Sequence, residues 1–162
     1  MSAVFFIVLI LDQVTKYLAR NYLRGTDGIS IIGDFFRLSY VENRGAAFGI
    51  LQHQKLFFIV TTVIIIAAIF YIRKKYRNRI SRAGEFSLQL ILAGAVGNLI
   101  DRVVFSFVTD FLDFKFGNLY DFPVFNIADI AVVVGTAIII FLVVTDKDTE
   151  NSDEKEKADG ES

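Results

Sequence analysis

The sequence predicts a mainly α-helical membrane protein, with four transmembrane helices and a small extracytoplasmic β-sheet. Of its 162 residues, 54% are hydrophobic, and the mean hydropathy of +0.50 is too high for an ordinary soluble domain of this length. Four segments are apolar enough to cross a bilayer as a helix, which takes roughly 20 residues: about 3–22, 56–73, 86–105 and 125–145. Residues 29–41 combine β-branched and aromatic side chains near glycines, which is typical of short strands.

The first apolar segment is the least clear of the four. It is interrupted by Asp12, Lys16 and Arg20, whereas Leu56 through Ile72 contain no charged residue. The first segment does not fit a cleaved signal peptide, because no basic region precedes it and no small-residue cleavage site follows. We therefore interpret it as a transmembrane helix.

The distribution of basic residues predicts how the helices are oriented. The short 73–85 segment has six basic residues, whereas the 24–55 segment is more than twice as long and has four. Short loops rich in Lys and Arg stay in the cytoplasm. With four spans, both termini are then cytoplasmic, and residues 24–55, with the predicted β region, and 106–124 lie outside.

Residues 1–145 are predicted to form a single transmembrane domain, followed by a tail. Residues 146–162 contain eight acidic and three basic residues, a net charge of −5, whereas residues 1–145 have a net charge of +4. An acidic segment without aromatic residues is typical of a disordered, solvated chain, here a cytoplasmic tail. The chain has no cysteine, which excludes disulfides, thiolate metal sites and a cysteine nucleophile.

Several polar residues fall within the apolar segments and at similar depth. At 1.5 Å per residue they lie roughly 6–15 Å from the outer ends of their helices, and Asp110 lies just outside. Ionised side chains at this depth cost at least about 2.5–3.5 kcal/mol, so they indicate function. The i, i+3, i+4 spacing of Asn98, Asp101 and Arg102 puts these three side chains on one helical face. The i, i+3 spacing of Asn126 and Asp129 puts these two on one face of the last helix. Two carboxylates that meet here, Asp110 and Asp129, would suit acid–base chemistry.

Each of these residues also has a structural interpretation. Asp129 lies at the start of a helix, where a carboxylate is favoured by the helix dipole. Asp110 alone is an ordinary loop acid. Asp101 and Arg102 could form a charge pair at the membrane interface. Asp12 and Lys16 could neutralise each other and so tolerate insertion.

Other kinds of site are excluded by the sequence. The single histidine, His53, rules out a His-Glu-x-x-His zinc site, and no Gly-x-Ser-x-Gly motif is present. Gly45–Gly49 lacks the Lys-Ser/Thr of a phosphate loop. These absences lead us to expect no metal and no cofactor. The 73–82 basic run lies beside a membrane helix, where it indicates topology and contact with anionic lipid, so we expect no nucleic-acid partner.

Two other classes of function fit a small membrane protein. An ion or proton carrier would need polar groups strung across the bilayer, but the inner halves of the last three predicted helices look apolar. A non-catalytic assembly factor would not need two paired acids.

Five segments in order match one known family. They are Asp12-Gln13-Val14-Thr15-Lys16, Asn43-Arg44-Gly45-Ala46-Ala47-Phe48, Gly97-Asn98-Leu99-Ile100-Asp101-Arg102, Val108-Thr109-Asp110-Phe111 and Phe125-Asn126-Ile127-Ala128-Asp129. Together they resemble the bacterial lipoprotein signal peptidases, or signal peptidase II, over about residues 4–145. One difference is that the position before Asn43, often basic in the family, is Glu42.

The resemblance implies an aspartic endopeptidase of the bacterial cytoplasmic membrane, with its active site near the outer face under an outer loop or helix. Its substrates would be diacylglyceryl-modified prolipoproteins in the lipid bilayer, cut just before the lipidated cysteine. The resemblance makes Asp110 and Asp129 the catalytic pair. The other functional positions it implies are Asp12, Asn43, Asn98, Asp101, Arg102 and Asn126.

Overall fold

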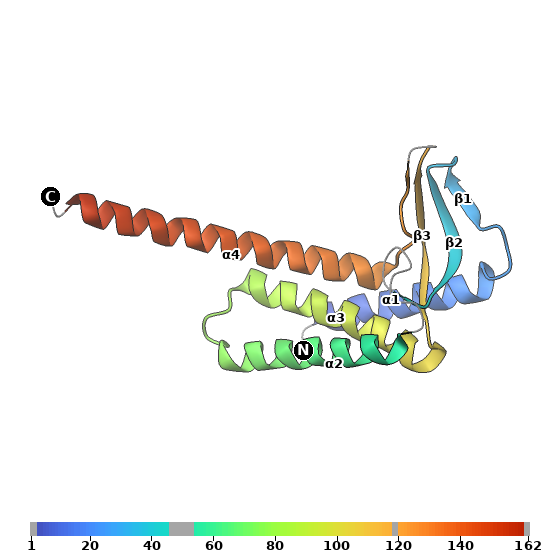
Figure 1. Ribbon diagram of the computed structural model, residues 1–162, viewed down its shortest axis with the longest axis horizontal. Coiled ribbons are helices and arrows are strands. Elements are labelled where there is room, and N and C mark those ends of the chain that lie inside the picture. Colours follow the sequence, from blue (N-terminus) through green and yellow to red (C-terminus); the bar gives the residue numbers. More distant parts are fainter. Residues whose placement is uncertain (1–2, 46–53, 118–119, 161–162) are drawn as a thin grey trace.

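The computed structural model describes residues 3–45, 54–117 and 120–160, with side chains described as far as Thr145. Four helices run side by side, and an antiparallel sheet with strand order β1-β2-β3-β4 lies at one end of them (Figure 1). The elements are α1 (Ala3–Tyr22), β1 (Ile29–Ile32), β2 (Phe36–Asn43), α2 (Lys55–Lys75), α3 (Arg82–Phe105), β3 (Val108–Phe116), β4 (Tyr120–Asp121) and α4 (Ile127–Gly160).

Local sequence explains where the second and third helices begin and end. The side chain of Ser81 caps α3 by accepting a hydrogen bond from the Gly84 backbone N–H (3.0 Å). At its other end, Ser106 adopts a left-handed conformation with φ 70°, and its N–H bonds to the Arg102 carbonyl. The last turn of α2 contains three basic residues, whose positive charges are stabilised by the negative end of the helix dipole.

Within the described residues, three helices have the length and apolar composition needed to cross a membrane: Lys55–Lys75, Arg82–Phe105 and Ile127–Thr145. They coincide with three predicted spans, although α3 begins earlier than expected. The helix α1 is 20 residues long but contains Asp12, Lys16 and Arg20, so composition alone does not assign it as a fourth span. A mainly helical membrane fold with a small antiparallel sheet is therefore confirmed, while the count of four remains a prediction.

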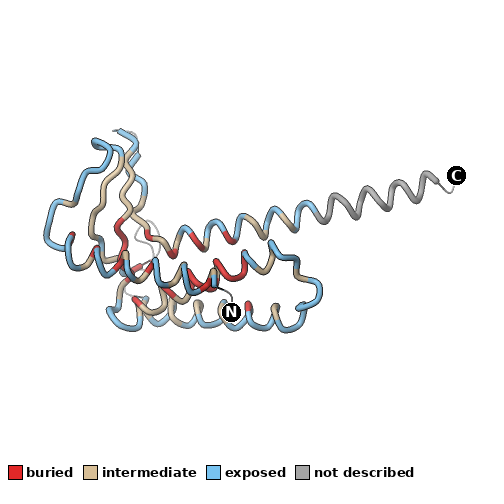
Figure 2. The backbone as a smooth tube through the Cα atoms, turned by 180° about the vertical axis from the view of Figure 1, so that it is seen from behind, coloured by how far each residue is buried: buried red, intermediate tan, exposed pale blue. Residues whose placement is uncertain are grey.

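The helix α3 is the centre of the bundle. Figure 2 shows that buried positions concentrate along α3 and where the helices meet the sheet. One apolar cluster joins Phe5 of α1, Ile69 of α2 and three residues of α3: Leu88, Leu92 and Ala93. By contrast, many apolar side chains of α2 are exposed, as expected for a surface that faces lipid rather than water.

Two glycines of α3 let other helices approach closely. A Cβ atom at Gly94 would lie 2.3 Å from the Ala128 carbonyl oxygen of α4. At Gly97 it would lie 2.5 Å from Oδ2 of Asp12 on α1. Both distances are shorter than any contact that a real Cβ atom makes. Glycine is therefore needed at both positions, so that the start of α4 and the middle of α1 can pack against α3.

The strand β3 was not predicted. It pairs with β2, with Val41 opposite Asp110 and Asn43 opposite Val108, after a bulge between Leu38 and Val41. Because side chains alternate along strands, Asn43 and Asp110 lie on the same face. The predicted outer β region, residues 24–55, was therefore too short. The strand pattern was present, because Thr109, Asp113 and Lys115 alternate with mostly apolar residues.

The predicted disordered tail also differs from the structure. Here α4 continues as a helix to Gly160, well beyond the bundle (Figure 1). Residues 153–158 are rich in Glu, Lys and Ala, which favour helix, and this local propensity explains the difference. The outer loop or helix expected over the site had no predicted residue range, and residues 46–53, which follow Gly45 at the cavity, lie outside the described part of the chain.

Candidate active site

Asp110 is a buried carboxylate held by two asparagines. It lies on β3 and is 1% exposed. The Asn43 Nδ2 atom of β2 donates a hydrogen bond to its Oδ2 (2.9 Å), and the Asn126 Nδ2 atom donates to its Oδ1 (2.6 Å). The strand register places Asn43 at this position, and Asn126 immediately precedes α4.

Asp129 lies in the first turn of α4 and makes two kinds of contact. Its Oδ2 accepts a hydrogen bond from the Asn126 backbone N–H (3.2 Å), and Asn126 Oδ1 accepts one from the Asp129 N–H (3.0 Å). This reciprocal pair is a capping box, so the helix-cap interpretation is confirmed. The other oxygen, Oδ1, accepts a hydrogen bond from Asn98 Nδ2 of α3 (2.8 Å).

The two aspartates are joined through Asn126, and we refer to Asp110 and Asp129 as the aspartate pair. The Nδ2 atom of Asn126 bonds to Asp110, while its Oδ1 and backbone N–H bond to Asp129. The same Nδ2 also lies 3.3 Å from Asn98 Oδ1. Residues that are 19 positions apart in sequence thus share one amide as a common neighbour.

Behind the aspartate pair lies a fully buried group of charges. Asp12, Lys16 and Asp101 are each 0% exposed. The Lys16 Nζ atom lies 3.0 Å from Asp12 Oδ2 and 3.6 Å from Asp101 Oδ2. The second oxygen of Asp12 accepts a hydrogen bond from the Ala128 backbone N–H (2.9 Å), which ties α1 to the start of α4. The predicted pairing of Asp12 with Lys16 is confirmed, and it belongs to a larger network.

Asp101 connects α3 to the strand that contains Asp110. Its Oδ2 accepts a hydrogen bond from the Thr109 backbone N–H (2.9 Å), one residue before Asp110. Arg20 of α1 donates to Thr109 Oγ1 (2.9 Å) and lies 3.4 Å from Asp101 Oδ1. The ion pairs of Asp101 are thus with Lys16 and Arg20, rather than with Arg102 as the charge-pair interpretation expected.

Arg102 instead faces the open side of the site. Its guanidinium carbon lies 4.8 Å from the centre of the Phe58 ring of α2, a cation–π contact, and one of its nitrogens lies 3.4 Å from the Asn98 carbonyl. It lines the same cavity as the aspartate pair.

This cavity has a volume of about 980 Å³. One side is polar, with the aspartate pair, Asn43, Asn98 and Arg102. The other side is apolar and comes from α4 and the segment before it: Phe122, Pro123, Val124, Phe125, Ile130, Val133 and Val134. Of the eight predicted site residues, five line the cavity, and the other three support it from behind: Asp12, Asp101 and Asn126.

Burial changes the protonation of Asp110. Loss of hydration and the nearby charge of Asp129 raise the pKa of Asp110 to about 7, although the hydrogen bonds from Asn43 and Asn126 oppose this. A carboxyl group in this range can hold or release a proton near neutral pH. That property is what acid–base chemistry requires.

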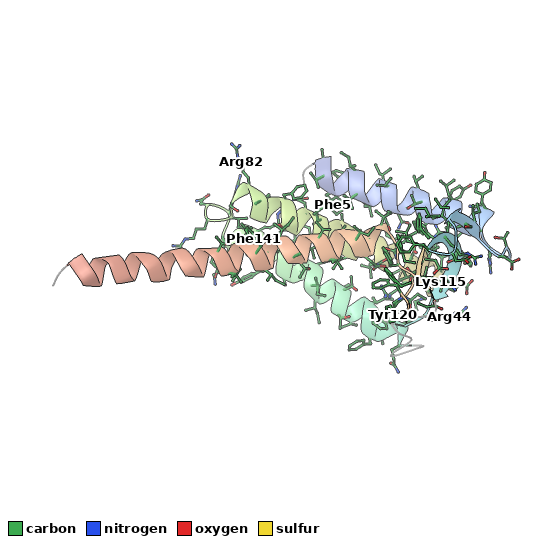
Figure 3. All side chains as sticks on the ribbon, turned by 90° about the horizontal axis from the view of Figure 1, so that it is seen from above. Phe5, Arg44, Arg82, Lys115, Tyr120 and Phe141 are labelled. Carbon is green, nitrogen blue, oxygen red and sulfur yellow. The ribbon has the colours of Figure 1, made fainter. Side chains whose placement is uncertain are left out.

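The unusual residue before Asn43 has partners of its own. Glu42 lies 2.9 Å from the Arg44 guanidinium and 3.5 Å from that of Arg24, and it accepts a hydrogen bond from the Tyr40 hydroxyl (3.1 Å). The Arg44 hydrogen bond holds the pKa of Glu42 below its usual range. Glu42 therefore organises basic side chains at the rim of the cavity, and Figure 3 shows Arg44 at the sheet end of the molecule.

Sequence reasoning missed part of this site. Lys16 was noted only as the partner of Asp12, while Arg20 and Thr109 were given no role. A usable signal existed, because Asp12, Lys16 and Arg20 follow at intervals of four and so share one face of an otherwise apolar helix. Within the part of the chain that the structure describes, no group of three or more His, Cys, Asp or Glu side chains could hold a metal ion.

The predicted apolar character of the inner half of α3 was wrong. Ser87 and Gln89 are buried there, and Gln89 donates a hydrogen bond to Glu85 (2.7 Å). Glu85 in turn forms an ion pair with Arg73 of α2 (2.5 Å). These polar groups lie next to the basic turn between α2 and α3, at the opposite end of the helices from the sheet (Figure 1).

Comparison with known proteins identifies the family. A family model described as "Signal peptidase (SPase) II" matches residues 4–145. The chain belongs to the signal peptidase II family. The resemblance found in the sequence is thus confirmed, and the chain is a membrane-type protease of this family.

Individual relatives agree with this family. The chain is 50% identical over 138 residues to a lipoprotein signal peptidase of Caldanaerobacter subterraneus subsp. tengcongensis, covering 85% of this chain and 90% of the relative. It is 42% identical to that of Clostridium acetobutylicum, again covering 85% and 90%. A bacterial membrane enzyme solved by the in meso method at 2.3 Å resolution matches with a TM-score of 0.81 and 36% identity, covering 89% of this chain and 87% of that one.

Proposed function

We propose that this signal peptidase II is an aspartic endopeptidase that removes signal peptides from diacylglyceryl-modified prolipoproteins, cutting before the lipidated cysteine. The observation that supports this most strongly is the aspartate pair itself. Two carboxylates from different elements are linked by Asn126 and open into one cavity. Relatives named lipoprotein signal peptidases indicate the substrate class.

In the proposed reaction, one aspartate is ionised and the other protonated. Close like charges disfavour double ionisation, so the pair holds one proton. The ionised carboxylate takes a proton from water, whose oxygen bonds to the scissile carbonyl carbon. The other carboxyl gives its proton to the carbonyl oxygen, which yields a gem-diol.

The second half of the reaction returns both groups to their starting state. The first carboxyl, now protonated, gives its proton to the leaving nitrogen as the C–N bond breaks. One hydroxyl of the gem-diol gives a proton back to the second carboxylate, so a carboxylic acid and an amine leave. The two aspartates titrate as a unit, and either can serve as the initial base.

The apolar wall of the cavity suits a lipid-modified substrate. Ile130, Val133 and Val134 of α4 line the cavity and are also exposed on the side of the helix that would face lipid. Acyl chains could therefore reach the cavity sideways from the bilayer without crossing a polar surface. The volume of about 980 Å³ is at the upper end of small-molecule pockets, as a diacylglyceryl group beside a peptide would require.

Burial supports α1 as the fourth span in this proposal. Asp12 and Lys16 are 0% exposed and the Arg20 side chain is 17% exposed, so α1 turns its charges toward the bundle and presents apolar residues outward. The basic α2–α3 turn would be cytoplasmic, together with both termini. Figure 3 shows Arg82, at the start of α3, far from Arg44, and this separation supports a cavity near the outer face of the bacterial cytoplasmic membrane.

Lipid modification of the substrate provides the main test. With purified enzyme in lipid, we expect a precursor carrying diacylglyceryl-cysteine to be cut, and the same peptide with unmodified cysteine to be cut at least about 100-fold more slowly. The reason is that acyl-chain burial would help to position the scissile bond. Cleavage products would be quantified by mass spectrometry, and equal rates for the two peptides would contradict the proposed substrate.

The raised pKa of Asp110 predicts how activity depends on pH. The pair must keep one proton, and that proton is lost as pH rises through the Asp110 pKa of about 7. We therefore expect kcat/KM to fall above about pH 7, approaching tenfold per pH unit. Cleavage assays between about pH 5 and pH 9 would check this, and activity that stays flat or rises to the alkaline end would refute it.

A further inference from the structure

Three asparagines direct their amide nitrogens at the aspartate pair. Asn43 and Asn126 donate to Asp110, and Asn98 donates to Asp129. A side-chain amide can turn either its oxygen or its nitrogen toward a given neighbour, and the hydrogen bonds on its other side decide which. The donors that fix each amide oxygen therefore decide whether an N–H group or an oxygen atom faces each carboxylate.

Two of the three amides are fixed by the backbone. The Oδ1 atom of Asn43 accepts a hydrogen bond from the Gly45 N–H (3.0 Å), and that of Asn126 accepts one from the Asp129 N–H (3.0 Å). Backbone N–H groups can only donate, so both Nδ2 atoms must turn toward Asp110.

Asn98 differs from the other two, because its orientation depends on a side chain. Its Oδ1 accepts a hydrogen bond from Lys16 Nζ (2.8 Å). A longer contact of 3.3 Å comes from Asn126 Nδ2, which is already bonded to Asp110 at 2.6 Å. An ammonium group has three donors and no acceptor, so it forces Asn98 to present oxygen to it and nitrogen to Asp129.

Lys16 itself cannot touch a substrate. It is 0% exposed, lies on α1, and is enclosed by Asp12 and Asp101. Charged groups face the aspartate pair from several elements: Asp12 and Lys16 of α1, Asp101 and Arg102 of α3, and Glu42, Arg44 and Asp121 around the cavity. Lys16 can therefore affect the reaction only through its charge, which lowers the pKa of Asp110, or through a residue that it positions.

We propose that Lys16 is a positioning residue that fixes the orientation of the Asn98 amide, and thereby keeps a hydrogen-bond donor on Asp129. The inference rests on the proposed function of the aspartate pair. Without the ammonium group, only the longer contact from Asn126 (3.3 Å) holds the Asn98 oxygen, and the amide can turn this oxygen toward Asp129. The ionised state of the pair then loses a donor and meets the partial negative charge of the amide oxygen.

Two substitutions separate the donor from the charge. Lys16→Met and Lys16→Gln have side chains of equal length and remove the same charge, but glutamine keeps an N–H donor for Asn98. Both leave Asp12 and Asp101 with one partner fewer, so similar losses of thermal stability are expected. If both variants fail to fold, the double variant Asp12→Asn/Lys16→Met, which removes one charge of each sign, takes the place of Lys16→Met.

The expected result is a difference in catalysis rather than in folding. We expect Lys16→Met to lower kcat roughly 10-fold to 100-fold, with KM little changed, and Lys16→Gln to keep most of the activity. The acid limb of the kcat profile should move further to higher pH in Lys16→Met than in Lys16→Gln, because both variants lose the charge that lowers the pKa of Asp110 but only Lys16→Met also loses the donor to Asn98. A matched control is Arg73→Gln, which breaks a remote ion pair and should leave the pH profile unchanged.

Two outcomes would overturn the inference. One is wild-type kcat and pH dependence in Lys16→Met. The other is an equal loss in Lys16→Met and Lys16→Gln that follows their melting temperatures. Neither outcome bears on the aspartate pair itself, whose failure would show as activity in Asp110→Asn or Asp129→Asn.

Discussion

Replacing either member of the aspartate pair with asparagine is expected to abolish cleavage of a lipid-modified precursor. Asparagine has nearly the same shape as aspartate but can neither take a proton from water nor donate one to the carbonyl. Each proton transfer by a positioned side chain contributes about 10²-fold to 10⁴-fold, so each variant should fall by at least that factor. Single-turnover cleavage with enzyme in excess would measure the residual rate.

The same variants should remain folded. Asp110→Asn removes a buried carboxylate that is costly to bury, although the new amide can satisfy only one of the two donors, Asn43 and Asn126, that face it. Asp129→Asn keeps an oxygen for the capping contact with Asn126. We therefore expect small changes in melting temperature in both variants.

Asp113→Asn is the matched control for the Asp110 variant. Asp113 belongs to the same strand but, three residues on, lies on its opposite face. This control should retain full activity. Substantial turnover by Asp110→Asn or Asp129→Asn would disprove the assignment, and a loss of activity in Asp113→Asn would show that the strand, rather than the carboxyl, is sensitive.

The helix-cap and the proposed catalytic interpretations of Asp129 are compatible. Its Oδ2 completes the capping box with Asn126, and its Oδ1 faces Asn98 beside the cavity. The cap fixes the rotamer of the carboxylate, which is what a reacting group needs. A residue that looks like a structural cap in the sequence can thus owe its precise orientation to that cap.

The sequence predicted the elements better than their contacts. Apolar runs and the i, i+3 spacing of Asn126 and Asp129 depend on neighbours within a few residues, and such local patterns are readable from one chain. The partner of Asp110 was predicted from the family resemblance, because no local pattern links positions 110 and 129. That link depends on the backbone contact between Leu112 of β3 and Phe125, which brings Asn126 and the start of α4 beside Asp110.

The buried charge network was beyond local reasoning for a different reason. Lys16 contacts Asn98 and Asp101, which are more than 80 residues away in sequence, and these contacts exist because α1 packs closely on α3. Spacing showed that Asp12 and Lys16 could pair with each other. It could not show that the lysine also bonds to Asn98, the amide beside Asp129.

Close packing of α4 on α3 leads to a second large expected effect. In Gly94→Ala, the added methyl group would lie 2.3 Å from the Ala128 carbonyl oxygen and 2.7 Å from Val132 Cγ2. A backbone oxygen cannot move without its helix, so the start of α4 must shift away from α3. We expect a destabilisation of about 1–3 kcal/mol from overpacking, although alanine is the better helix former.

The displacement of α4 in Gly94→Ala should lower the cleavage rate strongly while the protein still folds. The first turn of α4 holds Asp129 against Asn98 of α3, and Ala128 also bonds to Asp12. Displacement of a reacting group by about 1 Å can cost roughly 100-fold in rate, so Gly94→Ala should lose about that factor in kcat while still folding. Melting curves and cleavage rates on one preparation would compare the two losses.

Gly84→Ala is the control, because it makes the same change on the same helix. There the nearest atom is Ile80 Cγ2 at 3.1 Å, the end of a side chain that can rotate, and no backbone atom of α4 is in contact. This variant should match the wild type in rate and gain slightly in stability. If Gly94→Ala were equally active, the start of α4 would tolerate displacement, and the close contact between α3 and α4 would not position Asp129.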